Sequence, residues 1–531
     1  MCSSLTLFSL CIISSIISTT AAQQFPLVDL GYATHAPTYI NTTASGTRVS
    51  LYNNIRFAQP PTGALRFRKP STPPSSEKGI QDGRDRLFST DCVNAAPEMV
   101  PFPGLNGSAW GQEDCLFLNV WVPEGVRPGD NVPVIHWLHG SAYAFGSKDL
   151  LINAMGLMDL IQKPEDRFIF VASNYRLGLY GWASSPYEDM DANVGLHDGV
   201  AALQWTKDHI SHFGGDTNNI TAIGESAGGA MIALMLVANG GNGTLPFQKA
   251  FISSPAILPR RNVSARREEV YNHILQTANC SSLECLRNAP SSLLFDVNKQ
   301  LLIDTYGGGG GGTFGPGVGF GPLPDGKYIP DAMTILFNQG RYNKGIKAVV
   351  SGNMAAEGFA TTPDIGTPEE LSSLIRKVLP GASNTTVQRI RDMYPYPDSQ
   401  AQKIAQDWTT DSVWACNSQA IANAYANKTQ RYVFSVPPSS HGLDVNYMFF
   451  KDNTSSPVSS VSLARLFQSE MLKFSKEDIT MRNTTTWPLY STGSRTANIT
   501  LAGLETSIDP WATKPNCDII MKAIMDKRNG A

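Results

Sequence analysis

The chain has 531 residues, 42% of them hydrophobic, which is enough for one large core or two ordinary ones. Its 42 Lys and Arg residues nearly balance 45 Asp and Glu residues, so the formal net charge is -3. This balance argues against nucleic acid and against anionic membrane surfaces as partners.

The first 22 residues have the layout of a secretory signal peptide. An apolar core spans Leu5 to Ile17, and small residues at Thr20, Ala21 and Ala22 precede Gln23. No Lys or Arg precedes the core, which departs from the usual pattern. A membrane anchor is the alternative, but the apolar run is shorter than a span requires and is diluted by serines. We therefore expect cleavage after residue 22 and no stable membrane anchor.

Cysteine usage also fits an oxidising compartment. Cys2 and Cys11 leave with the predicted signal, and the six cysteines that remain permit three disulfides in 15 pairings. These six are Cys92, Cys115, Cys280, Cys285, Cys416 and Cys517.

Eleven N-x-S/T sequons support secretion, because such sequences accept N-linked glycans. They begin at Asn41, Asn106, Asn219, Asn242, Asn262, Asn279, Asn384, Asn427, Asn453, Asn483 and Asn498. Asn219 enters a predicted strand, and we expect it to be too buried to carry a glycan.

The first third of the chain predicts antiparallel strands and two long loops. Residues Val49–Pro70 alternate apolar and polar side chains and end in a turn-rich connection. A loop rich in Pro, Gly and apolar residues separates Cys92 from Cys115. Strands are expected at Leu116–Val122 and Val132–Leu138, and the loop His139–Gly146 follows the second.

Beyond this point strands and helices alternate. Strands are predicted at Phe168–Ser173, Ile220–Ile223, Lys249–Ser253, Lys347–Ser351 and Arg431–Val436, and helices at Asp198–Phe213, Ala227–Ala238, Ala265–Ala278, Pro368–Leu379 and Gln400–Ala426. This order predicts an α/β fold, with a mostly parallel sheet covered by helices on both faces. The Gly-rich segment Gly307–Pro322 could link two domains. We interpret it as a surface loop within one domain, residues 23–531, because the alternation resumes after it.

Residues Gly224–Gly228 match the pattern G-x-S-x-G between a predicted strand and a predicted helix. A sharp strand-to-helix turn holds its central residue in a strained conformation, and the flanking glycines avoid clashes. Ser226 would then stand at the sheet edge, close to the N–H groups of a helix start. The alternative is a Gly-rich turn whose serine only caps the helix.

A serine nucleophile requires a histidine base, which in hydrolases with this turn follows the serine and the acid in the chain. Only His273 and His441 follow Ser226. His273 lies in a polar helical pattern and is most simply a solvated side chain. His441 lies in a loop after a predicted strand, so we predict that it is the base.

The acid that orients the base should lie between Ser226 and His441. Glu357 follows a β-branched strand and meets this requirement. Asp325 and Asp331 compete by position, but both stand in turn sequences where aspartate is usually structural. Glu357 is therefore the predicted acid.

Acyl transfer also needs N–H donors for the oxyanion. One is expected from Ala227, directly after the nucleophile, and others from the loop after an early strand, His139–Phe145. His209 and His212 could suggest a metal site, but no further ligand stands at the required spacing. We predict no metal and no cofactor.

Taken together, these motifs resemble the type-B carboxylesterase/lipase family, the cholinesterase-like branch of the α/β-hydrolases, and in particular a secreted fungal-type esterase. The resemblance covers nearly the whole mature chain. It rests on Pro60–Phe67 (PPTGALRF), Glu113–Val120 (EDCLFLNV), Asn174–Gly178 (NYRLG), Phe213–Asp216 (FGGD), Gly224–Gly229 (GESAGG), Glu357-Gly358, His441-Gly442 and Trp487–Tyr490 (WPLY).

The resemblance implies an α/β-hydrolase fold with large loop insertions, a Ser226–Glu357–His441 triad and hydrolysis of small-molecule esters. It also implies the disulfides Cys92–Cys115, Cys280–Cys285 and Cys416–Cys517. Three other functions stay open within the family: a lipase or sterol esterase, a tailoring enzyme of one secondary metabolite, and a non-catalytic adhesion protein. The intact triad argues against the last.

Two features depart from the family. The family usually has His-Gly-Gly-Gly-Phe in the oxyanion loop, whereas this chain has Ser141 and Ala142 in place of the last two glycines. Their backbone N–H groups remain available, but the added side chains predict a tighter acyl pocket and short acyl groups. Trp110 is not at the position where cholinesterases bind a quaternary ammonium, so we interpret it as a packing residue.

Overall fold

The computed structural model describes residues 26–84, 90–97, 105–150, 152–261, 263–304 and 320–530. The predicted signal peptide, Asn262 and nearly all of the Gly-rich segment Gly307–Pro322 lie outside the described residues. Within the described part, no helix is long and apolar enough to cross a membrane.

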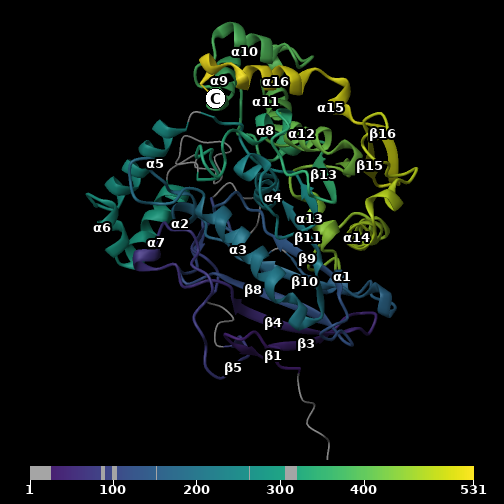
Figure 1. The fold of residues 1–531 in the computed structure, drawn as a ribbon. Coiled ribbons are helices and arrows are strands. Elements are labelled where there is room, and N and C mark those ends of the chain that lie inside the picture. The colour runs from purple at the N-terminus through teal and green to yellow at the C-terminus, as the bar shows by residue number, and fades with distance from the viewer. Residues whose placement is uncertain are drawn as a thin grey trace, which may run out of the picture.

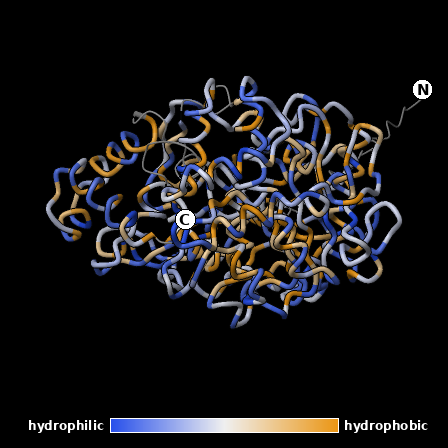
Figure 2. Tube along the Cα trace, turned by 90° about the horizontal axis from the view of Figure 1, so that it is seen from above, coloured by the Kyte–Doolittle hydropathy of each residue, from blue (hydrophilic) through white to orange (hydrophobic). Residues whose placement is uncertain are grey.

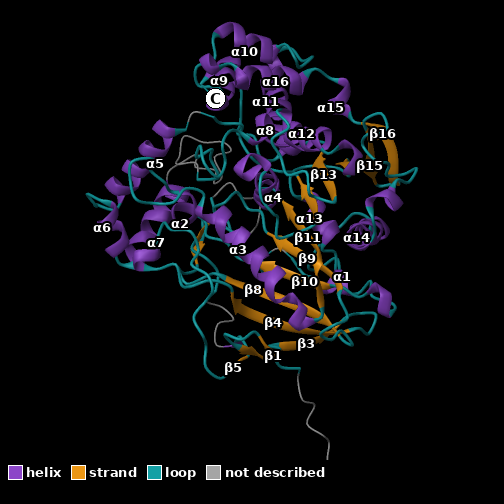
Figure 3. Cartoon of the chain, viewed as in Figure 1, coloured by secondary structure: helices purple, strands orange, loops and turns teal. Residues whose placement is uncertain are grey.

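One large mixed sheet organises the described fold (Figures 1 and 3). Its eleven described strands have the order β16-β15-β14-β13-β12-β11-β9-β10-β8-β4-β3. The run from β15 to β10 is parallel, and the outer pairs at both edges are antiparallel. The strands are β3 (Tyr39–Thr42), β4 (Arg48–Arg56), β8 (Phe117–Pro123), β9 (Val132–Leu138), β10 (Ile169–Ser173), β11 (Gly215–Glu225), β12 (Lys249–Ser253), β13 (Ala348–Met354), β14 (Thr429–Phe434), β15 (Arg495–Thr500) and β16 (Gly503–Ile508).

Two small sheets accompany it. The first has the order β1-β2-β5 and the second pairs β6 with β7. Their strands are β1 (Val28–Asp29), β2 (Thr34–His35), β5 (Ile80–Gln81), β6 (Asn94–Ala95) and β7 (Ala109–Trp110).

Helices cover both faces of the large sheet. Figure 1 shows α3 and α4 on one side, with α1 and α14 on the other. The described helices are α1 (Met155–Met158), α2 (Gly178–Trp182), α3 (Val194–His209), α4 (Ala227–Val237), α5 (Ser264–Thr277), α6 (Leu283–Asn288), α7 (Ser291–Lys299), α8 (Met333–Asn338), α9 (Pro368–Val378), α10 (Asn384–Arg391), α11 (Ala401–Thr409), α12 (Cys416–Ala424), α13 (Leu443–Met448), α14 (Val461–Lys476), α15 (Pro510–Thr513) and α16 (Asn516–Met525).

Strand β9 shows why core side chains lie on both faces of the large sheet. Successive side chains of a strand point to opposite faces, so Val134 and Leu138 join the cluster that contains α3 and α4. Ile135 and Trp137 join the cluster that contains α1 and α14. Figure 2 shows hydrophobic segments gathered toward the middle of the molecule and hydrophilic ones mainly along its outline.

The predicted architecture, a mostly parallel sheet between helical layers, is confirmed, whereas several boundaries differ. The helix predicted at Asp198–Phe213 begins at Val194 and ends in a 3-10 turn over Ile210–Phe213. The helix predicted at Gln400–Ala426 is α11 and α12, separated by a π-helical turn at Thr410–Ala415. An apolar pattern gives the buried face of such a segment but not a local change of helical pitch.

Three disulfides are present in the pairing that the resemblance implies. They join Cys92 to Cys115, Cys280 to Cys285 and Cys416 to Cys517. The first closes the loop that carries β6 and β7, and the last ties α12 to the C-terminal helix α16.

Candidate active site

Ser226 stands at the sharp turn between β11 and α4. Its backbone dihedrals, φ 56° and ψ -121°, are ones that residues other than glycine rarely adopt. Glycine is required at the positions around it, because a side chain there would clash with neighbouring backbone. A Cβ on Gly228 would lie 2.0 Å from the carbonyl oxygen of Leu138, and one on Gly224 would lie 2.6 Å from the backbone of Gly228. Strand β9, strand β11 and helix α4 therefore meet at contact distance beneath the serine.

Ser226, His441 and Glu357 form a continuous chain of hydrogen bonds. His441 Nε2 lies 2.8 Å from Ser226 Oγ, and His441 Nδ1 lies 2.7 Å from Glu357 Oε2. Glu357 follows β13 and His441 follows β14, so the three side chains meet at the carboxyl ends of parallel strands. Crevices at these ends are the usual ligand sites of open α/β sheets.

Glu357 is fully buried, and its second oxygen is also satisfied. Oε1 accepts hydrogen bonds from Ser254 Oγ and from the backbone N–H of Met354, both at 2.7 Å. These two donors fix the carboxylate so that Oε2 faces the imidazole. Gly358 permits the close approach of the neighbouring helix, since a Cβ there would lie 2.1 Å from the carbonyl oxygen of Gln406.

Two further buried carboxylates surround His441. Glu225 Oε1 lies 3.5 Å from His441 Nε2 and has no hydrogen-bond partner among the described residues. Asp444 accepts a hydrogen bond from Tyr432 at 2.7 Å and another from Ser253. Burial lowers the pKa of His441, but Glu225 and Glu357 outweigh it and raise the pKa to about 9. Burial also raises the pKa of the Glu225 carboxyl, although the nearby imidazole opposes the shift.

The loop after β9 has an unusual backbone. Ser141, Ala142 and Tyr143 have φ values of 74°, 55° and 61°, three consecutive residues in the left-handed region that glycine normally occupies. Among the described residues, no acceptor is recorded for the N–H groups of Ser141, Ala142 and Ala227. Gly140 places this loop against Ser226, because a Cβ there would lie 3.0 Å from the Cβ of Ser226.

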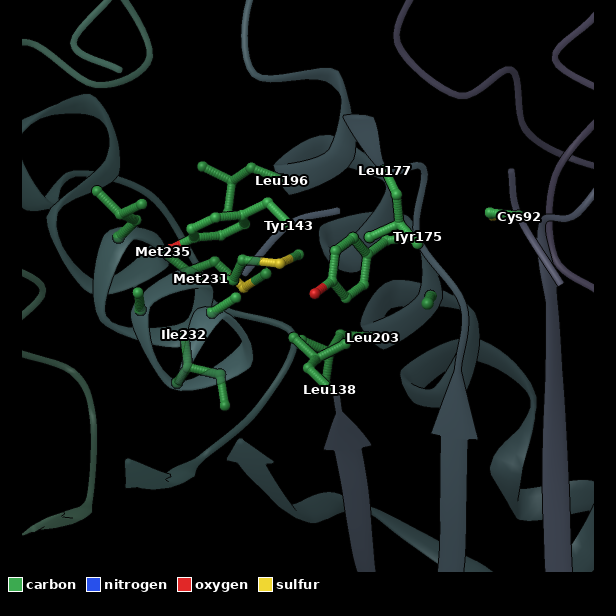
Figure 4. Close-up of a cluster of buried hydrophobic side chains, with 14 of the residues drawn as sticks. Cys92, Leu138, Tyr143, Tyr175, Leu177, Leu196, Leu203, Met231, Ile232 and Met235 are labelled. Carbon is green, nitrogen blue, oxygen red and sulfur yellow. The ribbon is translucent and has the colours of Figure 1, made fainter. Parts of the chain in front are cut away.

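Two buried tyrosines hold the loop in this conformation. Tyr143 Oη donates to the carbonyl of Ala256 at 2.8 Å, and its ring packs edge-on against Trp182. Tyr175 Oη donates to the carbonyl oxygens of His139 and Gly140 at 2.8 and 3.1 Å. Figure 4 shows Tyr143 and Tyr175 beside Leu138 and the α4 side chains, so the loop is an extension of the core.

His139, at the start of the loop, stacks on Tyr175 with a distance of 4.2 Å between ring centroids. Burial lowers its pKa to about 3. A neutral, stacked imidazole supports the loop and carries no charge toward the site.

The two competing aspartates lie in turns. Asp325 accepts from the backbone N–H groups of Lys327 and Ile329. Asp331 forms a bidentate ion pair with Arg261 at 2.8 and 2.9 Å. Both serve local structure, as their sequence context indicates.

The remaining candidates are also placed. His273 lies on α5, and the structure pairs His441 with Ser226 instead. His209 and His212 lie at the end of α3 and in the turn after it, and the described residues contain no group of three ligands that could hold a metal ion. Trp110 is half-buried, donates to Asp91 at 3.0 Å and packs against the main core.

Comparison with known proteins assigns the family. The model of the carboxylesterase family matches residues 38–501, most of the chain. The chain belongs to the carboxylesterase family. Carboxylesterase patB of Penicillium expansum is 29% identical over 511 residues, which is 86% of this chain and 89% of that protein. Lipase 2 of Geotrichum candidum is 32% identical over 66% of this chain and 67% of that protein.

The fold of this carboxylesterase agrees with solved structures. The crystal structure of Aspergillus niger EstA superposes with a TM-score of 0.80 over 96% of this chain and 99% of that chain, at 22% identity. The α/β-hydrolase fold expected from the sequence is thereby confirmed.

Sequence reasoning missed three residues of the carboxylesterase site. Ser254 follows β12 at the same sheet edge as the other groups, a position that could have drawn attention to it. Asp444 lies three residues after His441. Trp414, whose ring centroid is 4.7 Å from that of His441, lies within a helical pattern that carried no signal.

Proposed function

We propose that this carboxylesterase is a secreted serine hydrolase in which Ser226 is the nucleophile, His441 the base and Glu357 the orienting acid. The observation that carries the proposal is the unbroken chain Ser226 Oγ, His441 Nε2, His441 Nδ1 and Glu357 Oε2, with links of 2.8 and 2.7 Å. It lies within one catalytic domain over residues 23–531 and uses neither a cofactor nor a metal.

In the first step His441 removes the Ser226 proton while Oγ attacks the ester carbonyl. The negative oxygen of the tetrahedral intermediate is stabilised by the N–H groups of Ser141, Ala142 and Ala227. The intermediate collapses when the bond to the alcohol breaks, and His441 donates its proton to the leaving oxygen. The acyl group is then joined to Ser226.

The second step repeats this chemistry with water. His441 takes a proton from water, which attacks the acyl carbonyl, and the same N–H groups stabilise the oxyanion. The acid leaves as the proton returns to Ser226 Oγ. Glu357 stabilises the imidazolium in both steps and stays ionised.

A preference for short acyl chains is part of the proposal. Ser141 and Ala142 are half-buried, whereas Tyr143 to Ser147 in the same loop are buried. Their side chains occupy space that glycines at these two positions would leave open. Extra atoms in an acyl pocket penalise longer acyl groups, and one methylene is typically worth about 1–3 kcal/mol.

Secretion is supported by the signal-like N-terminus and by the three disulfides, which form in oxidising compartments. Glycosylation follows from the sequons, of which Asn41, Asn384 and Asn453 are exposed. Asn219 is half-buried, and Asn498 accepts a hydrogen bond from Ser435, so these two are poorer candidates.

The test is a panel of p-nitrophenyl esters, from acetate to palmitate, with the wild type and Ser226→Ala. The proposal expects acetate and butyrate to be the best substrates, and the Ser226→Ala variant to lose about 10⁴-fold or more in kcat while secretion and melting temperature are retained. Near wild-type turnover by this variant would refute the triad. Rates that rise toward palmitate would indicate a lipase.

A further inference from the structure

The ring face of His441 is covered by Trp414. Their ring centroids are 4.7 Å apart and the planes are inclined by 36°. Resting on the proposed role of His441, we propose that Trp414 is a positioning residue, which holds the imidazole in the orientation that joins Ser226 to Glu357.

The need for such a contact follows from the hydrogen bonds of His441. One ring nitrogen is bonded to Ser226 and the other to Glu357. Rocking of the ring about the line through these two nitrogens changes neither distance greatly, so the two bonds resist it weakly. A side chain packed on the ring face does resist it. Such rocking turns the Nε2 lone pair away from Ser226 Oγ, and because reaction requires aligned orbitals as well as a short distance, this restraint affects catalysis.

Trp414 is itself held by the π-helical turn Thr410–Ala415. Thr410 Oγ1 accepts a hydrogen bond at 2.9 Å from the N–H of Gly358, the residue after the acid. The buried carboxylate of Asp411 accepts from Trp511 Nε1 at 2.7 Å and from Asn516 Nδ2 at 2.8 Å. The same turn therefore contacts the Glu357 loop at one end and presents the indole to His441 near the other. Single π-helical turns occur frequently at functional sites.

The chain offers a matched control in Trp408. Trp408 and Trp414 belong to the same core cluster, with exposed fractions of 0% and 2%. Neither indole N–H has an acceptor among the described residues. Trp408 lies on α11, and no ring contact with His441 is recorded for it in the described part of the chain. Loss of either indole should cost similar stability, but only one should affect the base.

The experiment compares Trp414→Leu, Trp414→Phe and Trp408→Leu, using p-nitrophenyl butyrate and active sites counted by phosphonate titration. We expect Trp414→Leu to lower kcat about tenfold or more with KM changed less than about twofold, because the ring acts on the base and not on the substrate. Trp414→Phe keeps an aromatic ring beside the imidazole, so its kcat should stay within about threefold of the wild-type value. Trp408→Leu should lower the melting temperature to a similar extent and leave kcat per site within about twofold.

The proposal is overturned if the two Leu variants lose kcat equally, if Trp414→Leu changes mainly KM, or if Trp414→Phe is as impaired as Trp414→Leu. The Phe variant decides the matter if Trp414→Leu does not fold. Failure of the proposed function is recognised separately, since Ser226→Ala would then retain activity.

Discussion

Three buried carboxylates lie around His441, and their different contacts give them different roles. Glu357 is fully hydrogen-bonded and faces Nδ1. Glu225 has an oxygen without a hydrogen-bond partner among the described residues, and it lies near Nε2, the nitrogen that is hydrogen-bonded to Ser226. Asp444 is held by Ser253 and Tyr432 and is the weaker influence on the imidazole. We therefore infer that Glu225, when ionised, stabilises the imidazolium of the proposed mechanism, because its carboxylate lies 3.5 Å from Nε2 and raises the pKa of His441.

Replacement of Glu225 by Gln tests this role. The neutral amide stabilises the imidazolium less, so the pKa of His441 falls. The reaction requires neutral imidazole, and its rate rises with pH through that pKa. We expect the acidic limb of the pH profile of kcat/KM to shift to a pH about one unit lower. We also expect kcat at the optimum pH to fall about tenfold. Asp444→Asn is the matched control and should shift the limb less. An unmoved or upward-shifted limb in Glu225→Gln would contradict the assignment.

The oxyanion loop gives a second prediction at this scale. In the double variant Ser141→Gly, Ala142→Gly, the N–H donors remain, the left-handed backbone becomes unstrained and the acyl side of the site gains space. We expect the ratio of kcat/KM for octanoate to that for acetate to rise about tenfold. The measurement is the same ester series with both enzymes. An unchanged ratio would show that these side chains do not limit the acyl group.

That Ser226, Glu357 and His441 would lie together could be predicted, because chain order and strand-end position restrict the choice of residues. Only two histidines follow Ser226 in the chain. Glu357 follows a strand whose apolar sequence indicates that it is buried. Ser254 carried a signal of the same kind, because it directly follows β12. Trp414 could not be predicted in this way, because it reaches the site from a π-helical turn and only packing brings it against His441.

At the scale of elements, the site depends on how closely α4 approaches β9. The absence of a side chain at Gly228 allows the helix to start directly against the carbonyl of Leu138. Buried strands such as β12 could be predicted to the residue, because their apolar runs end at clear polar boundaries. The start of α3 at Val194 could not, since the chain enters it through Asn193 in a left-handed conformation, without a side-chain cap.

The Gly228→Ala variant tests the helix-strand contact. Its Cβ would lie 2.0 Å from the Leu138 oxygen, so helix or strand must move. We expect a loss of about 3 kcal/mol in stability, the upper end for overpacking, together with a loss of activity. Gly366→Ala is the control, because its Cβ would have no neighbour closer than 3.6 Å. Equal melting temperatures for the two variants would contradict this account of the turn.

At the scale of the whole molecule, the disulfide between Cys416 and Cys517 ties the segment that carries Trp414 to the C-terminal helix. The two cysteines are 101 residues apart, compared with 5 for Cys280 and Cys285. Spacing alone left 15 pairings open, and only the resemblance to a family selected among them.

Loop length predicts unequal effects of removing the two bonds. Removal of a disulfide that closes a loop of about 100 residues releases more conformational entropy of the unfolded chain than removal of one that closes a short loop. For the long loop this corresponds to about 4.7 kcal/mol. We expect Cys416→Ser, Cys517→Ser to lower the free energy of unfolding in urea by about 2–3 kcal/mol more than Cys280→Ser, Cys285→Ser does. An equal or reversed order would show that local contacts, not chain entropy, dominate.

The most direct test of the proposed mechanism is covalent labelling of the nucleophile. A p-nitrophenyl alkylphosphonate should release one p-nitrophenol per chain and leave the phosphonyl group on Ser226 Oγ, detected by intact mass and peptide mapping. The label should be absent in Ser226→Ala, and it should form far more slowly in His441→Ala, which lacks the base. A label on any other residue, or equal rates with and without His441, would contradict the account.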